Sequence, residues 1–331
     1  MKVFLTGAFG TIGVQTLRFL CEKGHPVRCL DLPTRQNRRK YRNLSRRYPL
    51  EVIWGDICDP SVVGMALNGI DAVIHLAGLI PPASERNPEA AYQVNVEGTR
   101  GLLQAAKKQK TPPSVLFTSS YTTCGPANPA DPLQTPFTPQ APNNHYTRHK
   151  VQCEEMLLES GLRWNIVRLS LVMDPAKIAQ LDPEMFEIPL DQRIELLHPE
   201  DAGRALAAIV DTDVCEQVLM LGGGGDWQIT YREMLSGFMP LFGLRLPPET
   251  AFRTPSNPGD WYYTNWMDTA ESQRLLQFQT ISFASFLEEC RRKNGWLGLL
   301  ARPFRGVIEY FLLRMSDYYA VSREKATFQN A

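Results

Sequence analysis

The 331-residue chain lacks any long hydrophobic run. No stretch of about 20 consecutive apolar residues occurs, so we expect no transmembrane helix. The segment Met1–Leu5 leads directly into glycines and is too short for the apolar part of a signal peptide. We therefore expect a cytoplasmic protein.

The sequence also lacks paired cysteines. Its seven cysteines include no CxxC pair and show no metal-ligand spacing with the five histidines, so we expect no metal site. An odd number of widely scattered cysteines is typical of buried free thiols in a reducing compartment.

An excess of charge of either sign is missing as well. Lys plus Arg and Asp plus Glu both number 35, which argues against a nucleic-acid partner, since that affinity comes mainly from basic charge. The charge is nevertheless unevenly spread, because residues 35–47 contain seven basic residues and no acidic one. We expect this run to be a solvated helix or loop.

Short apolar runs alternate with helical patterns through the first half of the chain. We expect strands at 3–5, 26–32, 52–54, 72–77, 114–118 and 165–169, with helices between them, including 89–107 and 146–159. Near-continuous apolar strands alternating with helices predict a parallel sheet covered on both faces. The fold class is therefore α/β, a doubly wound parallel sheet of the Rossmann type.

The pattern loosens after residue 175, which predicts a smaller C-terminal substrate-binding lobe. We expect a nucleotide-binding domain at 1–175, a lobe at 176–295 that returns at least one element to the first domain, and a helical extension at 296–331. Within the lobe the sequence predicts helices at 201–211, 231–242, 269–276 and 283–292, and a strand at 217–221.

A glycine loop follows the first predicted strand and begins the first predicted helix. Gly7 permits a tight turn, Gly10 lets the backbone approach a pyrophosphate, and Gly13 permits close helix packing. Asp31 ends the second strand, where the ribose hydroxyls of a dinucleotide should lie. We expect the cofactor to contact Gly7, Phe9, Gly10, Thr11, Ile12 and Asp31.

The spacing TGxxGxxG resembles the extended short-chain dehydrogenase/reductase superfamily, also described as the NAD-dependent epimerase/dehydratase family. Further motifs occur in that family's order: Gly55-Asp56, His75–Gly78, Asn95–Thr99, Ser119–Gly125, Tyr146–Lys150 and His198–Asp201. Cys124 stands where the family usually has tyrosine. The resemblance implies further cofactor contacts at Asp56, Ile57, Leu76, Ala77, Gly78, Asn95, Thr118, Tyr146 and Lys150.

Tyr146 and Lys150 are four residues apart, which places them on one helix face. A phenol has a pKa near 10, and a nearby ammonium lowers that pKa. Ser120 follows the fifth strand, at the edge where open α/β sheets bind ligands. The resemblance implies that Tyr146 is the acid/base, that Lys150 tunes it and holds the nicotinamide ribose, and that Ser120 polarises the substrate carbonyl.

Asp31 favours NAD as the cofactor, because a carboxylate accepts hydrogen bonds from both ribose hydroxyls and repels a 2′-phosphate. NADP remains the alternative, since Arg35 begins the basic run only four residues later.

The reaction that we favour is hydride transfer to or from a small hydroxyl or keto substrate. Tyr121-Thr122 stands where dehydratases of this type have Asp-Glu, and the 48 residues from Lys150 to His198 are few for binding a nucleotide. The first alternative is a nucleotide-sugar epimerase with tightly bound NAD. The second is a non-catalytic NAD-binding regulatory protein.

Residues 296–320 are rich in Leu, Phe, Tyr and Trp, with Arg302, Arg305 and Arg314 among them. We favour a helix docked on the protein's own sheet or on a second subunit over an amphipathic helix on a membrane surface. The resemblance also implies a homodimer that forms through the helices containing Asn95 and Tyr146.

Overall fold

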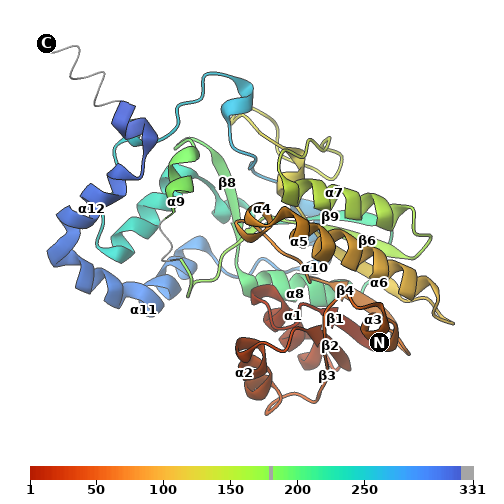
Figure 1. Ribbon diagram of the computed structural model, residues 1–331. Helices are drawn as coiled ribbons and strands as arrows, with labels where there is room; N and C mark the ends of the chain where they lie inside the picture. The colour runs from red at the N-terminus through yellow and green to blue at the C-terminus, as the bar shows by residue number, and fades with distance from the viewer. Residues whose placement is uncertain (179–181, 322–331) are drawn as a thin grey trace, which may run out of the picture.

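A computed structural model describes residues 1–178 and 182–321 of the chain. Its larger sheet has seven parallel strands in the order β3-β2-β1-β4-β5-β6-β9 (Figure 1). The predicted doubly wound sheet is therefore confirmed. The strands are β1 (Val3–Thr6), β2 (Val27–Asp31), β3 (Leu50–Trp54), β4 (Ala72–His75), β5 (Ser114–Ser120), β6 (Trp164–Leu169) and β9 (Gln217–Leu221).

Helices cover both faces of this sheet and enclose two apolar cores. One core joins the sheet to α1 (Thr11–Glu22), α8 (Pro199–Ile209) and α10 (Ala270–Leu276). The other joins it to α3 (Pro60–Ala66), α6 (Gly98–Lys107) and α7 (His145–Leu158). Burial on both faces explains why these strands are apolar throughout instead of alternating.

The helix expected at 89–107 is present, with a change of winding in its middle. It consists of α5 (Pro88–Tyr92), a π-helical segment (Gln93–Glu97) and α6, and the short α4 (Ala83–Arg86) precedes it. The π-helical segment contains the buried Asn95, which belongs to one of the family-like motifs.

The smaller lobe is built around a second sheet in the order β10-β8-β7. Its strands are β7 (Leu171–Val172), β8 (Arg193–Leu197) and β10 (Gln228–Thr230), and its helices are α9 (Tyr231–Phe238), α11 (Phe283–Ala301) and α12 (Arg305–Arg314). Helix α11 runs without a break across residue 295, where the sequence predicted that the lobe would end. Short 3₁₀ turns lie at Tyr121–Cys124, Pro183–Glu187, Gly225–Trp227, Met239–Phe242, Glu249–Ala251, Pro258–Asp260 and Arg302–Phe304.

Part of the basic run forms a helix, α2 (Arg35–Leu44), none of whose residues is fully buried. The Thr34 hydroxyl accepts a hydrogen bond from the Asn37 amide at 3.1 Å and so caps its N-terminus. The half-buried residues of α2 are Asn37, Lys40, Tyr41 and Leu44, which recur at helical spacing on one face. The run is therefore solvated on one side only.

The C-terminal stretch does not dock on the large sheet, which corrects one of the placements favoured from the sequence. Helices α11 and α12 pack on the small lobe through side chains such as Phe286, Cys290 and Leu312. Their other face carries exposed apolar side chains. No helix in the described part of the chain is both long and apolar enough to cross a membrane.

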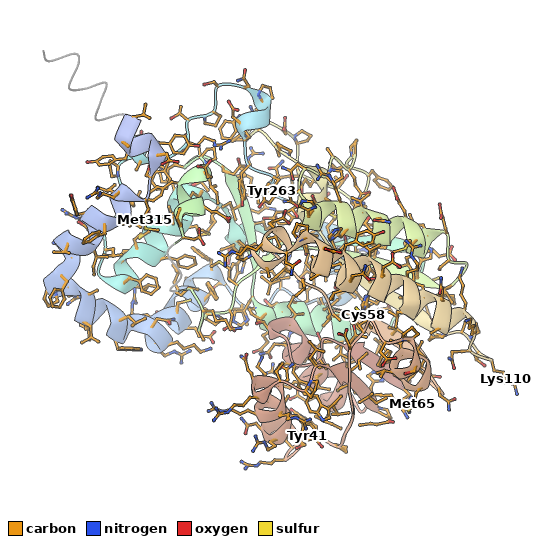
Figure 2. The ribbon with its side chains drawn as sticks, viewed as in Figure 1. Tyr41, Cys58, Met65, Lys110, Tyr263 and Met315 are labelled. Atoms are coloured by element: carbon orange, nitrogen blue, oxygen red, sulfur yellow. The ribbon has the colours of Figure 1, made fainter. Side chains whose placement is uncertain are left out.

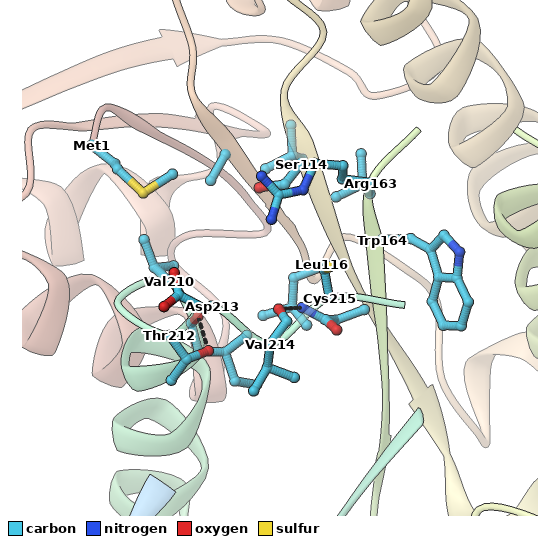
Figure 3. Close-up of a pocket in the computed structure, with 15 residues that line it drawn as sticks. Met1, Ser114, Leu116, Arg163, Trp164, Val210, Thr212, Asp213, Val214 and Cys215 are labelled. Atoms are coloured by element: carbon cyan, nitrogen blue, oxygen red, sulfur yellow. Dashed lines mark hydrogen bonds between the residues drawn. The ribbon is translucent and has the colours of Figure 1, made fainter. Parts of the chain in front are cut away.

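A hollow lies at the amino ends of the strands of the large sheet (Figure 3). It is lined by Met1, Ser114 and Arg163 from that edge and by Thr212–Cys215 from the loop between α8 and β9. The carboxyl ends of the strands, where the predicted site residues lie, form the opposite edge.

Candidate active site

The glycine loop has the local geometry that a dinucleotide requires. Gly7 has φ +65°, and a Cβ there would lie 2.9 Å from the Ala77 nitrogen. A Cβ at Gly13 would lie 2.2 Å from the Gly7 oxygen. Gly10 is the N-cap residue of helix α1. Because glycine has no side chain, no side chain caps the N–H groups of the first helical turn. Those donors fit a pyrophosphate.

Asp31 is bound to the same loop. Its Oδ2 accepts a hydrogen bond from the Phe9 amide at 2.8 Å, and its Oδ1 accepts bonds from the Leu32 amide at 2.8 Å and from Asn37 Nδ2 at 2.9 Å. Burial raises the pKa of Asp31, while the two amides and Lys40 act in the opposite direction. Two of the predicted cofactor residues, Asp31 and Phe9, are thus in direct contact.

Two lysines that the sequence analysis missed also reach the glycine loop. Lys40 Nζ donates a hydrogen bond to the Phe9 oxygen at 2.5 Å, and Lys177 Nζ bonds Thr11 Oγ1 at 3.2 Å. Arg35, the predicted alternative ligand for a 2′-phosphate, is exposed at the first position of α2. Lys40 could have been identified from the sequence, because it lies three residues after Asn37 on the same face of α2. Lys177 could not, because it lies 166 residues after Thr11.

Aromatic side chains pack against Phe9 of the glycine loop. The Phe9 ring stacks on Trp54 with centroids 5.3 Å apart, and Tyr41 meets both rings edge-on at 6.2 and 5.8 Å. Tyr41 is labelled in Figure 2, on the α2 side of the molecule. Helix α2, β3 and the glycine loop are therefore held as one unit.

The end of β4 lies beside the glycine loop, where the strand order of the sheet reverses. Thr6 Oγ1 accepts hydrogen bonds from the Leu76 and Ala77 amides at 3.2 and 3.1 Å. Asn95 bonds both backbone groups of Leu79, at 2.7 and 2.9 Å, and a Cβ at Gly78 would lie 3.1 Å from its Oδ1. Such a reversal point is where open α/β sheets bind nucleotides.

The remaining predicted cofactor residues have structural contacts of their own. Ile12 packs against the first core, and Ile57 is buried against Gly98. Asp56 is exposed and accepts a bond from the Cys58 amide at 3.0 Å, whereas Thr118 Oγ1 donates to the His75 oxygen at 2.8 Å. Their contact with a cofactor stays a prediction.

The three predicted catalytic side chains converge at the carboxyl end of β5. Ser120 is the last residue of that strand, and Tyr146 and Lys150 come from α7. Lys150 Nζ donates to the Thr118 oxygen at 2.7 Å and lies 5.6 Å from the centroid of the Tyr146 ring. Burial lowers the pKa of Lys150 to about 8. Ser120 Oγ shares a hydrogen bond of 2.7 Å with Thr122 Oγ1.

The pKa of Tyr146 differs from the sequence-based expectation. Burial raises the pKa of Tyr146 to about 12, and a hydrogen bond with Ser120 acts in the opposite direction. The expected lowering by Lys150 does not prevail, because loss of hydration penalises the phenolate more strongly. At neutral pH Tyr146 is therefore protonated and able to donate a proton.

Glu85 positions the start of α7, and no sequence pattern indicated it. Its two carboxylate oxygens accept hydrogen bonds from the Tyr146 and His145 amides at 3.0 and 3.2 Å. A carboxylate at a helix N-terminus is stabilised by the orphan donors and by the helix dipole. Because Glu85 lies on α4, sixty residues earlier, only the fold brings it to Tyr146.

Two further tyrosines, Tyr262 and Tyr263, follow each other in the chain, and Tyr263 lies near Tyr121 and Glu85. The rings of Tyr262 and Tyr263 stack with centroids 4.0 Å apart, and their hydroxyls bond at 2.6 Å. Burial is the main cause that raises the pKa of Tyr263, which is labelled in Figure 2, and the nearby Glu184 and Glu85 carboxylates add to it. Burial and the nearby Glu195 and Tyr263 raise the pKa of Tyr121, which follows Ser120 directly. The Tyr121 side chain is buried and packs against Met220 and Met267.

Comparison with known proteins identifies the family of this chain. A model of the NAD dependent epimerase/dehydratase family matches residues 3–222. The chain also resembles the UDP-glucuronic acid 4-epimerase of Bacillus cereus, crystallised with NAD, at 20% identity and a TM-score of 0.72, covering 90% of this chain and 100% of that one. A likeness at that identity supports the fold alone.

Two curated relatives match at 31% identity. One is the photosystem II assembly factor Ycf39 of Cyanophora paradoxa, matched over 51% of this chain and 45% of its own. The other is a 3 beta-hydroxysteroid dehydrogenase/Delta 5-->4-isomerase of Mycobacterium tuberculosis (strain CDC 1551 / Oshkosh), matched over 47% and 42%. The matched region spans less than half the length of each of these relatives.

Proposed function

Because this chain belongs to the NAD-dependent epimerase/dehydratase family, we propose that it is an NAD(P)-dependent oxidoreductase acting on a hydroxyl or keto carbon of a small substrate. The observation that carries the proposal is the convergence of Ser120, Tyr146 and Lys150 at the sheet edge that also presents the glycine loop. All three side chains retain the chemistry that proton-coupled hydride transfer needs.

When bound, the nicotinamide cofactor supplies or accepts the hydride. Tyr146, protonated at neutral pH, donates a proton to the substrate oxygen in the reductive direction. The Ser120 hydroxyl bonds the same oxygen and orients it. The Lys150 ammonium stabilises the phenolate that Tyr146 becomes, and its bond to the Thr118 oxygen fixes its position.

Cofactor choice follows from Asp31, whose carboxylate repels a 2′-phosphate. We expect substrate-dependent turnover of added NAD to exceed that of NADP, measured as the absorbance of reduced nicotinamide. Equal or faster use of NADP would contradict this choice. It would indicate that Lys40 and Lys177, beside the glycine loop, bind the 2′-phosphate. An enzyme that converts its substrate with no net turnover of added cofactor, and keeps NAD through purification, would be the epimerase instead.

The second alternative, a non-catalytic NAD-binding regulatory protein, gains support from the relative named as an assembly factor. The buried Lys150 beside Tyr146 argues against it, since burying a cation is costly unless the site uses it. Binding of NAD without hydride transfer to any substrate would favour that alternative.

Lys150 predicts the pH dependence of reduction. Its pKa of about 8 means that the ammonium is present below that pH and is lost as the pH rises through it. We expect kcat for reduction to fall above pH 8 by about tenfold per unit. The matched variant is Lys150→Arg, whose guanidinium keeps its charge and should shift the fall to higher pH. The same fall in that variant would assign it to another group.

A further inference from the structure

The outer face of α11 and α12 carries a continuous stripe of exposed apolar side chains. Trp296, Leu299 and Leu300 lie on α11, followed by Phe304 in the 3₁₀ turn and by Val307 and Phe311 on α12, each 58–65% exposed. Within α11 and within α12, the spacing of three or four residues puts these side chains on one side of each helix. A globular protein normally turns such a stripe toward its core. We call this set the apolar stripe.

The inner face of the same stretch is already in contact with the small lobe. A Cβ at Gly298 would lie 2.4 Å from the Leu241 oxygen, and Ser316 Oγ donates to the Ala251 oxygen at 2.6 Å. Arg253 bonds both Glu187 and the Tyr318 hydroxyl, which fastens the end of the stretch. The helices are therefore fixed with the apolar stripe outward.

Basic side chains border the apolar stripe. Residues 291–314 contain six Lys or Arg and only one acid, Glu309, whose carboxylate is held by Arg245 at 2.7 Å. A hollow beside the stripe is lined by Arg302 and Arg305 together with Pro240, Gly243 and Leu244. Among the ion pairs of residues 1–178 and 182–321, none within 4.0 Å involves Arg302 or Arg305; Arg245 is the main cause that lowers the pKa of Glu309, and Arg305 adds a smaller effect. The hollow thus has the charge to receive a phosphate.

We propose that this face docks on an anionic phospholipid surface, with lipid phosphates at Arg302 and Arg305 and the apolar stripe in the headgroup–acyl boundary. Exposed aromatic and leucine side chains with arginines around them favour binding to such surfaces. Arginine stems also pack on apolar surface while their charged ends reach phosphate. The predicted homodimer would use α5, α6 and α7, which lie on the opposite side of the molecule in Figure 1, so it would leave this face free.

The test is co-sedimentation of the full chain with phosphatidylcholine vesicles, with and without phosphatidylglycerol. We expect binding to the anionic vesicles, weakened by added salt. Reversing two charges in Arg302→Glu/Arg305→Glu should lower the partition coefficient by about thirtyfold or more. The matched control is Arg39→Glu/Arg46→Glu on the basic run, which changes the same net charge elsewhere and should leave binding within about threefold.

The apolar half is tested with Trp296→Ser/Leu300→Ser/Phe311→Ser, which should also lose vesicle binding by roughly tenfold or more. Its control is Met65→Ser/Phe137→Ser, which alters two exposed apolar side chains elsewhere. An affinity for NAD and an unfolding temperature equal to those of the wild type would show that each variant is folded. Absence of vesicle binding by the wild type, or equal losses in the controls, would overturn the proposal. A dimer that the triple variant dissociates, without vesicle binding, would assign the face to a second copy.

Discussion

Replacing Tyr146 with phenylalanine is expected to lower kcat by roughly 10²–10⁴-fold, the usual contribution of a positioned general acid. The hydroxyl is the only group removed, and the half-buried ring can stay on α7 beside Lys150. Steady-state kinetics with a substrate that the wild type converts give the ratio of the two kcat values directly.

The control for this variant is the affinity for NAD, measured by calorimetry. Tyr146 is also a predicted cofactor contact, but the variant keeps its ring and leaves the glycine loop and Asp31 unchanged, so we expect the dissociation constant to change by less than about threefold. A variant that keeps full activity would remove Tyr146 from the mechanism. A variant that loses NAD binding to the same extent as kcat would make it a binding residue instead.

Replacing Arg168 with methionine is expected to destabilise the fold by about 3–5 kcal/mol, because it leaves a buried carboxylate unpaired. Arg168 on β6 forms a two-point ion pair with Glu154 on α7, at 3.2 and 2.8 Å, and both residues are at most 5% exposed. Gln140 also donates to Glu154 at 2.9 Å. The pair therefore ties α7 to the sheet two turns after Tyr146.

Urea unfolding measures this prediction. The double variant Arg168→Met/Glu154→Leu removes both charges and should recover much of the lost free energy of unfolding. If Arg168→Met lowers the free energy of unfolding by less than about 1 kcal/mol, the Glu154 carboxylate is protonated or hydrated in the variant and not left as a buried, unpaired charge. Arg168 is therefore a structural residue, buried against Glu154 and away from solvent.

The sequence could predict those parts of the site that depend on the spacing of residues within one helix, strand or loop. Gly7 and Gly13 stand where no Cβ fits, Asp31 ends β2, and Tyr146 and Lys150 share one face of α7 because a helix turns in 3.6 residues. Apolar runs located the large sheet because its strands are buried on both faces. The short strands β7 and β10 carry no such signal, since they have only two and three residues.

The rest depends on contacts between distant segments. Glu85 reaches the Tyr146 amide, Lys177 reaches Thr11, and Tyr263 approaches Tyr121 only once the lobes are folded. The pKa of Tyr146 was misjudged for the same reason, because a sequence shows the charge of Lys150 and not the burial that outweighs it. The outward orientation of the apolar stripe likewise follows from which face of α11 and α12 the small lobe covers.

We propose that Tyr146 and Lys150 complete a hydride-transfer site on an NAD-binding fold. The most direct measurement is deuterium transfer from NADH labelled at nicotinamide C4 to a panel of small ketones and ketosteroids, followed by mass spectrometry of the alcohols. The wild type is predicted to place deuterium in at least one alcohol product, and Tyr146→Phe is predicted to do so roughly 10²–10⁴-fold more slowly. A wild-type protein that binds NADH yet transfers no deuterium, or a Tyr146→Phe variant that transfers it at the same rate, would contradict the claim.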